Sequence, residues 1–195
     1  MDIVFATANE GKLVEIKSVL AEFNILSLKD LKTGIEIIED GATFEENAVK
    51  KAQTISRLLN IPVLADDSGL EIDYLDKAPG VYSARYMGED TSYSVKNSRI
   101  LNLMKDVPTR QRTARFVCVI AYAKPGSETV TVRAEVEGII HSRIQGENGF
   151  GYDPIFFIPQ LNKTTAELSL AEKNEISHRG KALKLMKELL NNEIP

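Results

Sequence analysis

The sequence predicts a mixed α/β fold, in which a central sheet of parallel and antiparallel strands is flanked by helices. In its first third, short apolar runs alternate with segments of helical periodicity, which is typical of strands joined by helices. Two long runs of strand-forming residues follow at 113–124 and 128–140, and the turn residues PGS between them indicate an antiparallel hairpin. We expect a single domain over residues 1–195, folded as two lobes with a cleft between them.

The first helices are predicted by the spacing of apolar residues. Residues 2–7 (DIVFAT) form an apolar run that predicts a buried strand, and segment 12–23 after it has apolar residues at helical spacing. Segment 44–59 (FEENAVKKAQTISRLL) repeats that spacing. Thr43 and Glu46 form the pattern of a capping box, which predicts where this second helix begins.

The second half of the chain predicts two more helices and one more strand. Residues 92–104 form a third helix, and the apolar run PIFFIP at 154–159 is a short strand. A C-terminal helix is marked by apolar residues at helical spacing: Ala182, Leu183, Met186, Leu189 and Leu190.

Composition limits the function classes and the compartment. The formal net charge of −4 argues against broad binding of nucleic acid or of anionic membranes. The single cysteine, Cys118, cannot form a disulfide within the chain, and its apolar surroundings predict a core residue rather than a reactive thiol. No signal-peptide pattern opens the chain and no apolar run is long enough to span a membrane, so we expect a cytoplasmic protein.

Two acidic stretches suggest a site for a hard cation. The apolar run 61–66 predicts a short strand that ends at Asp66 and Asp67. Because neighbouring strand residues point to opposite faces, we expect Asp67 to be the working carboxylate and Asp66 to support it by capping the turn. A second predicted strand ends at Glu39 and Asp40 and would supply another carboxylate for an ion such as Mg²⁺. Each stretch taken alone is better explained as a polar turn.

Two further segments offer groups that bind phosphate. The hexapeptide TANEGK, Thr7 to Lys12, joins the first strand to the first helix, where free N–H groups and the positive end of the helix dipole suit an anion. It matches no general phosphate-binding motif, and an ordinary loop is the alternative. Asn47 and Lys51 share one face of the second helix; Lys51 would reach a phosphate or lie in solvent.

Two segments near the C-terminus suggest a site for a nucleobase. The loop Gly146–Pro154 (GENGFGYDP) combines glycines, which let the backbone approach a ligand, with aromatic rings that can stack on a base. The segment EKNEISHRGKA carries Lys173, His178 and Arg179, hydrogen-bond donors able to read acceptors on a base edge. The alternatives are a tight loop that packs its aromatic rings into the core, and a basic turn on the surface.

Together and in order, these motifs resemble the inosine/xanthosine triphosphate pyrophosphatase family. The resemblance rests on TANEGK, EDGATFEENAVKKA, ADDSGLEIDYL, APGVYSARY, GFGYDPIF and EKNEISHRGKAL, and it runs from Thr7 to Leu183. It implies an elongated α/β protein with a central cleft, usually a homodimer. The implied reaction is the Mg²⁺-dependent hydrolysis of ITP, dITP or XTP to the monophosphate and pyrophosphate, which clears deaminated purines from the nucleotide pool.

The resemblance also implies a role for each matching residue. Asp67 would accept the proton of the attacking water and, with Glu39, hold Mg²⁺. The triphosphate and the nucleobase would be bound by Thr7, Ala8, Asn9, Glu10, Gly11, Lys12, Lys51, Ser68, Phe150, Gly151, Tyr152, Asp153, Lys173, His178 and Arg179. Three alternatives stay open: a nucleotide-binding regulator without turnover, a pyrophosphatase for pyrimidine or modified nucleotides like the Maf-like proteins, and a γ-phosphatase.

Overall fold

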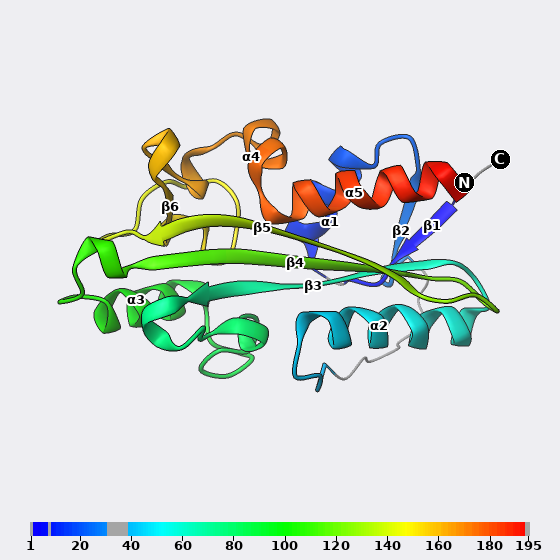
Figure 1. Ribbon diagram of the computed structural model, residues 1–195, viewed down its shortest axis with the longest axis horizontal. Helices are drawn as coiled ribbons and strands as arrows, with labels where there is room; N and C mark the ends of the chain where they lie inside the picture. The colour runs from blue at the N-terminus through cyan, green and yellow to red at the C-terminus, as the bar shows by residue number, and fades with distance from the viewer. Residues whose placement is uncertain (1, 8, 31–38, 194–195) are drawn as a thin grey trace. The chain divides into compact units, whose positions relative to one another are not determined.

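The computed structural model describes residues 2–7, 9–30 and 39–193, which form a mixed sheet of seven strands (Figure 1). The strands are β1 (Asp2–Phe5), β2 (Asn24–Ser27), β3 (Val63–Ile72), β4 (Thr113–Ala123), β5 (Val130–Ile140), β6 (Phe156–Ile158) and β7 (Lys163–Thr164). Their order across the sheet is β2-β1-β3-β4-β5-β6-β7. Strand β1 runs parallel to β2 and β3, whereas β6 is antiparallel to β5 and β7, so the predicted mixed α/β fold is confirmed.

The helices of the described residues lie close to the predicted segments, except at 170–176, where no helix was predicted. They are α1 (Glu10–Val19), α2 (Phe44–Leu59), α3 (Tyr93–Leu103), α4 (Leu170–Ile176) and α5 (His178–Glu193). Helix α2 has its predicted bounds and begins where Thr43 Oγ1 accepts a hydrogen bond from the Glu46 N–H at 3.1 Å. The Glu46 carboxylate accepts from the Ala42 N–H instead of the Thr43 N–H, so only half of the predicted capping box is formed.

The strands differ from the predicted ones at several points. Strand β3 does not end at the aspartates: it continues through Asp66 and Asp67 as far as Ile72. The other predicted strand, which would end at Glu39, falls mostly on residues 31–38 and lies outside the described residues. Strand β2 was not predicted, because its four residues are too few to show a period. Strands β4 and β5 are neighbours in the sheet, as the predicted hairpin requires.

The chain divides into two compact units, each built from separate segments of sequence. Unit 1 comprises Met1–Ser68, Cys118–Ala134 and His178–Pro195, and unit 2 comprises Gly69–Val117 and Glu135–Ser177. In unit 1, α1 and α5 cover one face of the sheet and α2 covers the other (Figure 1). In unit 2, α3 lies on one side of the strands and α4 on the other.

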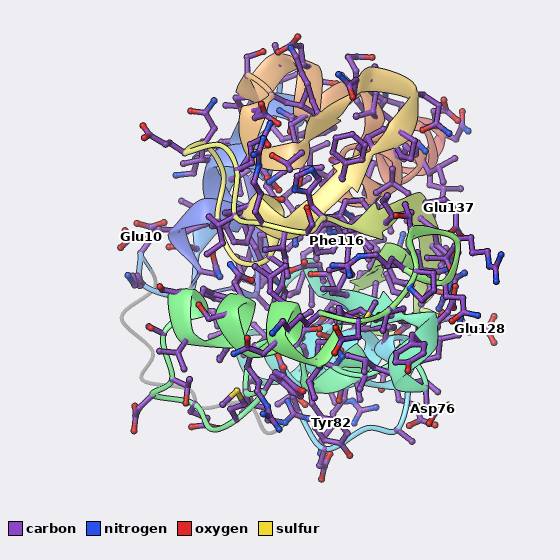
Figure 2. All side chains as sticks on the ribbon, turned by 90° about the vertical axis from the view of Figure 1, so that its left-hand side faces the viewer. Glu10, Asp76, Tyr82, Phe116, Glu128 and Glu137 are labelled. Carbon is purple, nitrogen blue, oxygen red and sulfur yellow. The ribbon has the colours of Figure 1, made fainter. Side chains whose placement is uncertain are left out.

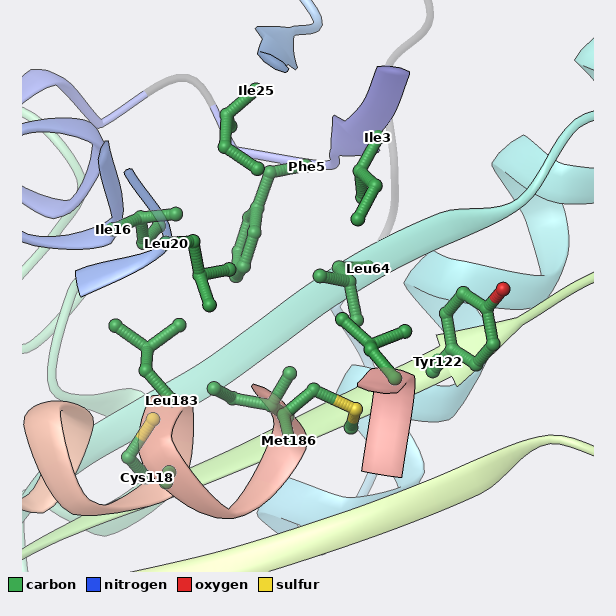
Figure 3. Packing of buried hydrophobic residues seen from close by; sticks show 13 residues of the cluster. Ile3, Phe5, Ile16, Leu20, Ile25, Leu64, Cys118, Tyr122, Leu183 and Met186 are labelled. Carbon is green, nitrogen blue, oxygen red and sulfur yellow. The ribbon is translucent and has the colours of Figure 1, made fainter. Parts of the chain in front are cut away.

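Each unit has its own hydrophobic core. In unit 1, Phe5 of β1, Leu20 at the end of α1 and Leu183 of α5 belong to one cluster of buried side chains (Figure 3). Cys118 belongs to this core, and burial raises the pKa of its thiol to about 12, which confirms a packing role. In unit 2, the Phe116 ring lies inside, with its centroid 4.4 Å from that of Phe156, whereas Tyr82 lies on the outside (Figure 2).

Among the described residues, every helix is too short or too polar to cross a membrane.

Candidate active site

Strand β3 sends the two adjacent aspartates of unit 1 to opposite faces of the sheet. Asp66 Oδ2 lies 2.9 Å from Lys12 Nζ of α1 and 3.3 Å from Arg179 Nη2 of α5. Asp67 Oδ2 accepts a hydrogen bond of 2.9 Å from Asn47 Nδ2 of α2, the helix on the other face. This is the alternation expected of an extended strand, and it gives the two carboxylates different partners.

Asp66 is a fully buried anion shared by several cations. Burial alone would raise its pKa, but Lys12, Arg179 and Lys51 outweigh that effect and hold the pKa of Asp66 well below its usual range. Its Oδ2 atom also lies 3.3 Å from Ser68 Oγ, which in turn accepts from Arg179 Nη2 at 2.8 Å. Because β3 continues past it, Asp66 does not cap a turn as predicted; it holds Lys12, Ser68 and Arg179 in place.

Glu15 is a member of this group that the sequence reasoning missed. It lies buried on α1, and its Oε2 atom is 2.5 Å from Arg179 Nη1. A cation near a helix N-terminus is unfavourable to the helix dipole, so Arg179 at the start of α5 needs such a partner. Its pKa is raised because the attraction of Asp66 and Glu15 outweighs burial, which acts the other way. The available signal was the three-residue spacing of Lys12 and Glu15, which puts them on one helix face.

The other face of β3 brings Asp67 together with Lys51 and Glu39. Lys51 is only 5% exposed, so it is not a solvated surface lysine, and its Nζ atom lies 2.5 Å from Glu39 Oε1. Burial would lower the pKa of Lys51, but the surrounding carboxylates of Asp66, Glu39 and Asp67 raise it. Burial raises the pKa of Asp67, and repulsion from Glu39 adds to this against the opposing pull of Lys51.

Glu39 and Asp67 fit a hard divalent cation. Both side chains offer carboxylate oxygens, and they lie near enough for the charge of Glu39 to raise the pKa of Asp67. A bound cation would relieve this repulsion between the two carboxylates. Within 2–7, 9–30 and 39–193, no group of three or more His, Cys, Asp and Glu side chains is placed to hold a metal. Two carboxylates suit Mg²⁺, which completes its shell with water and phosphate oxygens, better than zinc.

The predicted phosphate segment forms the start of α1. Asn9 Oδ1 accepts from the Lys12 N–H at 3.1 Å and so caps the helix, and Thr7 Oγ1 accepts from the Asn9 N–H at 3.2 Å. Glu10 is exposed and its carboxylate pairs with Lys29 at 2.8 Å. Gly11 lies in the first turn of α1, and Ala8 lies outside the described residues. Of this segment, the Lys12 side chain is the one that joins Asp66.

Unit 2 brings together three of the predicted nucleobase residues. Asp153 Oδ2 accepts from the Phe150 N–H at 2.8 Å and from Lys173 Nζ at 2.6 Å. Lys173 Nζ also lies 4.8 Å from the centroid of the Phe150 ring, a cation–π distance. Thr165, which the sequence reasoning missed, donates from Oγ1 to Asp153 Oδ1 at 2.9 Å. The Asp153 carboxylate is therefore the common partner of this group.

The loop Gly149–Asp153 aims its two aromatic rings differently. Tyr152 is buried, and its hydroxyl donates to the Ser83 carbonyl at 2.8 Å, so this ring packs into the core of unit 2. Phe150 is half-buried. Gly149 has φ +75°, and a Cβ atom there would lie 2.2 Å from Asp153 Oδ2, so this position requires glycine.

The remaining predicted base-reading residues belong to the other unit. His178 is the first residue of α5 and is buried, and Arg179 follows it; both lie in unit 1. Phe150, Gly151, Tyr152, Asp153 and Lys173 lie in unit 2. The structure therefore groups Arg179 with Lys12, Asp66 and Ser68, whereas it groups Lys173 with Phe150 and Asp153.

Comparisons with known proteins point to one family. The model of the Ham1 family matches residues 3–189. A protein of Exiguobacterium sibiricum named dITP/XTP pyrophosphatase is 50% identical over 192 residues, which cover 97% of each chain. One of Geobacter sulfurreducens with the same name is 48% identical over 190 residues, or 96% of each chain. The solved structure of the Staphylococcus aureus Ham1 protein has a TM-score of 0.89 and 41% identity, covering 99% of this chain and all of its own.

Proposed function

The chain belongs to the Ham1 family, and on that premise we propose that it hydrolyses ITP, dITP and XTP to the monophosphate and pyrophosphate. The observation that carries the proposal is the arrangement around Asp67, a buried carboxylate of raised pKa near Lys51 and Glu39. The relatives named dITP/XTP pyrophosphatase support the choice of substrate. Such an enzyme removes deaminated purine nucleotides from the pool of precursors.

We propose Mg²⁺ as the cofactor, with Glu39 and Asp67 as its protein ligands. Two carboxylates leave room in the shell for water and for phosphate oxygens, which is how Mg²⁺ is usually held. When bound, the ion supplies charge neutralisation on the phosphates and lowers the pKa of a bound water. Lys51, which pairs with Glu39, would then also donate hydrogen bonds to the phosphates.

The reaction breaks one phosphoanhydride bond. Asp67 orients a water molecule or takes its proton, and the water oxygen bonds to the α-phosphorus. The bond from the α-phosphorus to the bridging oxygen breaks, and pyrophosphate leaves with the electron pair. Lys12 and Lys51 stabilise the charge of the departing pyrophosphate. Thr7, Asn9 and the N-terminus of α1 bind the phosphates, and Ser68 contacts the substrate.

The group in unit 2 is proposed to take the base. The Phe150 ring would stack on the purine, and Lys173 and Asp153 would bond to its edge. Lys173 would donate a hydrogen bond to a 6-oxo group as well as to Asp153, whereas the 6-amino group of adenine offers no acceptor; a site that bonds to a substrate group rejects an analogue that lacks it by about 10⁴. Guanine also carries a 6-oxo group, so its rejection would come from a site with no acceptor for the 2-amino group.

Arg179 is a proposed base-binding residue whose side chain has several partners. Its guanidinium already donates to Glu15, Asp66 and Ser68. Any further hydrogen bond from Arg179 to a ligand would therefore share its donors with these partners.

We also propose that the protein is a cytoplasmic homodimer. A nucleotide-pool enzyme acts where the precursors are made, and a dimer is usual for the family that the sequence resembles. Light scattering on the purified protein measures the mass directly: about twice 21.6 kDa is expected, and 21.6 kDa contradicts the dimer.

The proposed function is tested by product analysis. The protein is incubated with Mg²⁺ and, in separate tubes, ITP, XTP, dITP, GTP and ATP; a parallel set contains EDTA. Monophosphate and pyrophosphate are expected from the first three, with little from GTP and ATP and none with EDTA. Orthophosphate and diphosphate would place the attack on the terminal phosphorus and contradict the mechanism. Binding without turnover would instead indicate a nucleotide-binding regulator.

A further inference from the structure

Helix α3 presents two side chains, one turn apart, to the loop Gly149–Asp153 within unit 2. Asn97 Nδ2 donates a hydrogen bond of 3.0 Å to the Gly151 carbonyl. The Tyr93 ring meets the Tyr152 ring edge-on, with centroids 5.2 Å apart and planes at 90°. One helix face thus contacts two consecutive residues of the loop that also carries Phe150 and Asp153.

This loop needs such an anchor because of its backbone. Gly149 and Gly151 both have positive φ, at +75° and +69°, and flank Phe150. Glycine has the widest choice of backbone conformations, so the direction of the Gly151 carbonyl is set by its surroundings rather than by its own residue. The Asp153 carboxylate holds the Phe150 N–H on one side, and Asn97 holds the Gly151 carbonyl on the other.

The Oδ1 atom of the Asn97 amide shows why an asparagine matters at this position. Asn97 is 3% exposed, and its Oδ1 atom is buried with no hydrogen-bond partner among the described residues. The amide cannot be turned to relieve this, because the Gly151 carbonyl accepts and needs the Nδ2 donor. A buried acceptor without a donor destabilises the fold. For packing alone, leucine would fill a similar volume without that cost, so the amide is retained for the bond it donates.

We propose that Asn97 is a positioning residue for base recognition: it fixes the Gly151 carbonyl and thereby holds Phe150 and Asp153 in the arrangement that meets a purine base. Asn97 itself is assigned no contact with substrate. The inference rests on the proposed function, in which Phe150 and Asp153 take the base. The hydrogen bond that the Asn97 side chain donates goes to the Gly151 carbonyl within unit 2, so we expect Asn97 to have little effect on the bond-breaking step.

The test compares Asn97→Leu with Asn102→Leu, the same change at an exposed position of the same helix. For Asn97→Leu, the KM for ITP is expected to rise roughly five- to tenfold, the factor that one neutral hydrogen bond supplies. The preference for ITP over ATP falls by a similar factor, kcat changes less than about twofold, and the melting temperature does not fall. Asn102→Leu leaves all four quantities unchanged. An unchanged KM and preference, or an equal loss of kcat for every nucleotide, would overturn the inference.

A second measurement separates this inference from the proposed function. Hydrogen exchange at the amides of Phe150–Asp153 is expected to be faster in Asn97→Leu than in wild type, whatever the protein hydrolyses. Unchanged exchange overturns the anchor even if the wild type cleaves ITP. Faster exchange in a protein that cleaves none of the nucleotides keeps the anchor and refutes the function. If Asn97→Leu does not fold, Asn97→Ser, whose hydroxyl is too short to reach Gly151, is judged by the same outcomes.

Discussion

The two units assemble their polar groups in different ways. In unit 1, side chains from α1, β3 and α5 form connected ion pairs. Asp66 pairs with both Lys12 and Arg179, and Arg179 also pairs with Glu15. In unit 2, the buried ion pair of Asp153 with Lys173 is accompanied by hydrogen bonds to backbone groups. Shared charges suit a ligand that brings several negative charges, whereas a loop held by directional bonds suits a flat ligand read by shape.

The difference gives each unit its own kinetic signature. Substitutions in the unit 1 group should lower kcat for every nucleotide, because phosphates are common to all of them. Substitutions in the unit 2 group should raise KM and weaken the preference among bases, because only the base distinguishes the substrates.

Asp67→Asn should give the largest loss. It keeps the size of the side chain and removes the proton acceptor, so kcat for ITP should fall by about 10³ or more, within the range of general-base catalysis. Pyrophosphate release measures this. Asp76→Asn, the same change at an exposed residue of unit 2, is the matched control and should leave kcat unchanged. A loss of less than tenfold in Asp67→Asn would mean that another group accepts the proton.

Arg179→Ala tests whether one residue can affect both stability and base preference. It leaves Asp66 and Glu15 buried with one cation fewer, so the free energy of unfolding should fall by about 3–5 kcal/mol. Urea unfolding measures this, with Arg99→Ala, an exposed arginine, as the control. If Arg179 also reads the base, the preference for ITP over ATP should fall about tenfold or more; an unchanged preference would confine Arg179 to positioning Asp66 and Ser68.

Asp153→Asn should show the signature of unit 2. It removes the charge that pairs with Lys173 but keeps an acceptor for the Phe150 N–H. The KM for ITP should rise about tenfold, since bonds to charged groups are worth more than neutral ones, while kcat stays within about twofold. Steady-state kinetics with ITP and ATP decide the matter. A fall in kcat that is equal for both nucleotides would show that this carboxylate acts in the chemical step.

Thr165→Val should act more weakly in the same direction. It removes the hydroxyl that donates to Asp153 Oδ1 and keeps the branched shape. The free energy of unfolding should fall by about 1 kcal/mol and the KM for ITP should rise about two- to fivefold. Thr165→Ser keeps the hydroxyl and should resemble wild type. A valine variant with a wild-type KM would show that Lys173 and the loop backbone suffice to orient Asp153.

The smallest expected signal is the reaction of Cys118 with a thiol reagent. Burial raises its pKa to about 12, so at pH 8 the thiol is neutral as well as enclosed, and native protein should not be labelled. As the one cysteine of the chain, and a member of unit 1, it reports the opening of that unit alone. Labelling should begin with urea unfolding. Rapid labelling of native protein would show that the unit 1 core opens readily.

The sequence predicted most helices and missed details that depend on distant residues. Helix α2 could be placed residue by residue because both its cap and its apolar face lie within its own segment. Strand β3 was predicted too short because two adjacent aspartates are typical of a turn. The strand continues because Lys12 and Arg179, far away in the sequence, neutralise Asp66, and no local pattern contains those partners.

The site followed the same rule. Side chains that bear recognisable chemistry, such as Lys12, Lys51 and Asp153, were predicted from their motifs. Glu15, Asn97 and Thr165 were missed, because each acts by holding another residue and its own sequence surroundings are ordinary. Two lobes were expected, but the segments that make up each unit could not be predicted, since neither unit is continuous in sequence.

The shared partners of Asp66 also bear on how such a protein can change over generations. Loss of Asp66 would remove a charged partner of the buried Arg179, and loss of Arg179 would remove a cation from beside Asp66 and Glu15. Any single substitution among these three residues therefore destabilises the fold severely. Viable lineages should therefore alter these positions jointly or leave them alone, whereas Lys29, whose exposed pair with Glu10 contributes little, should drift freely.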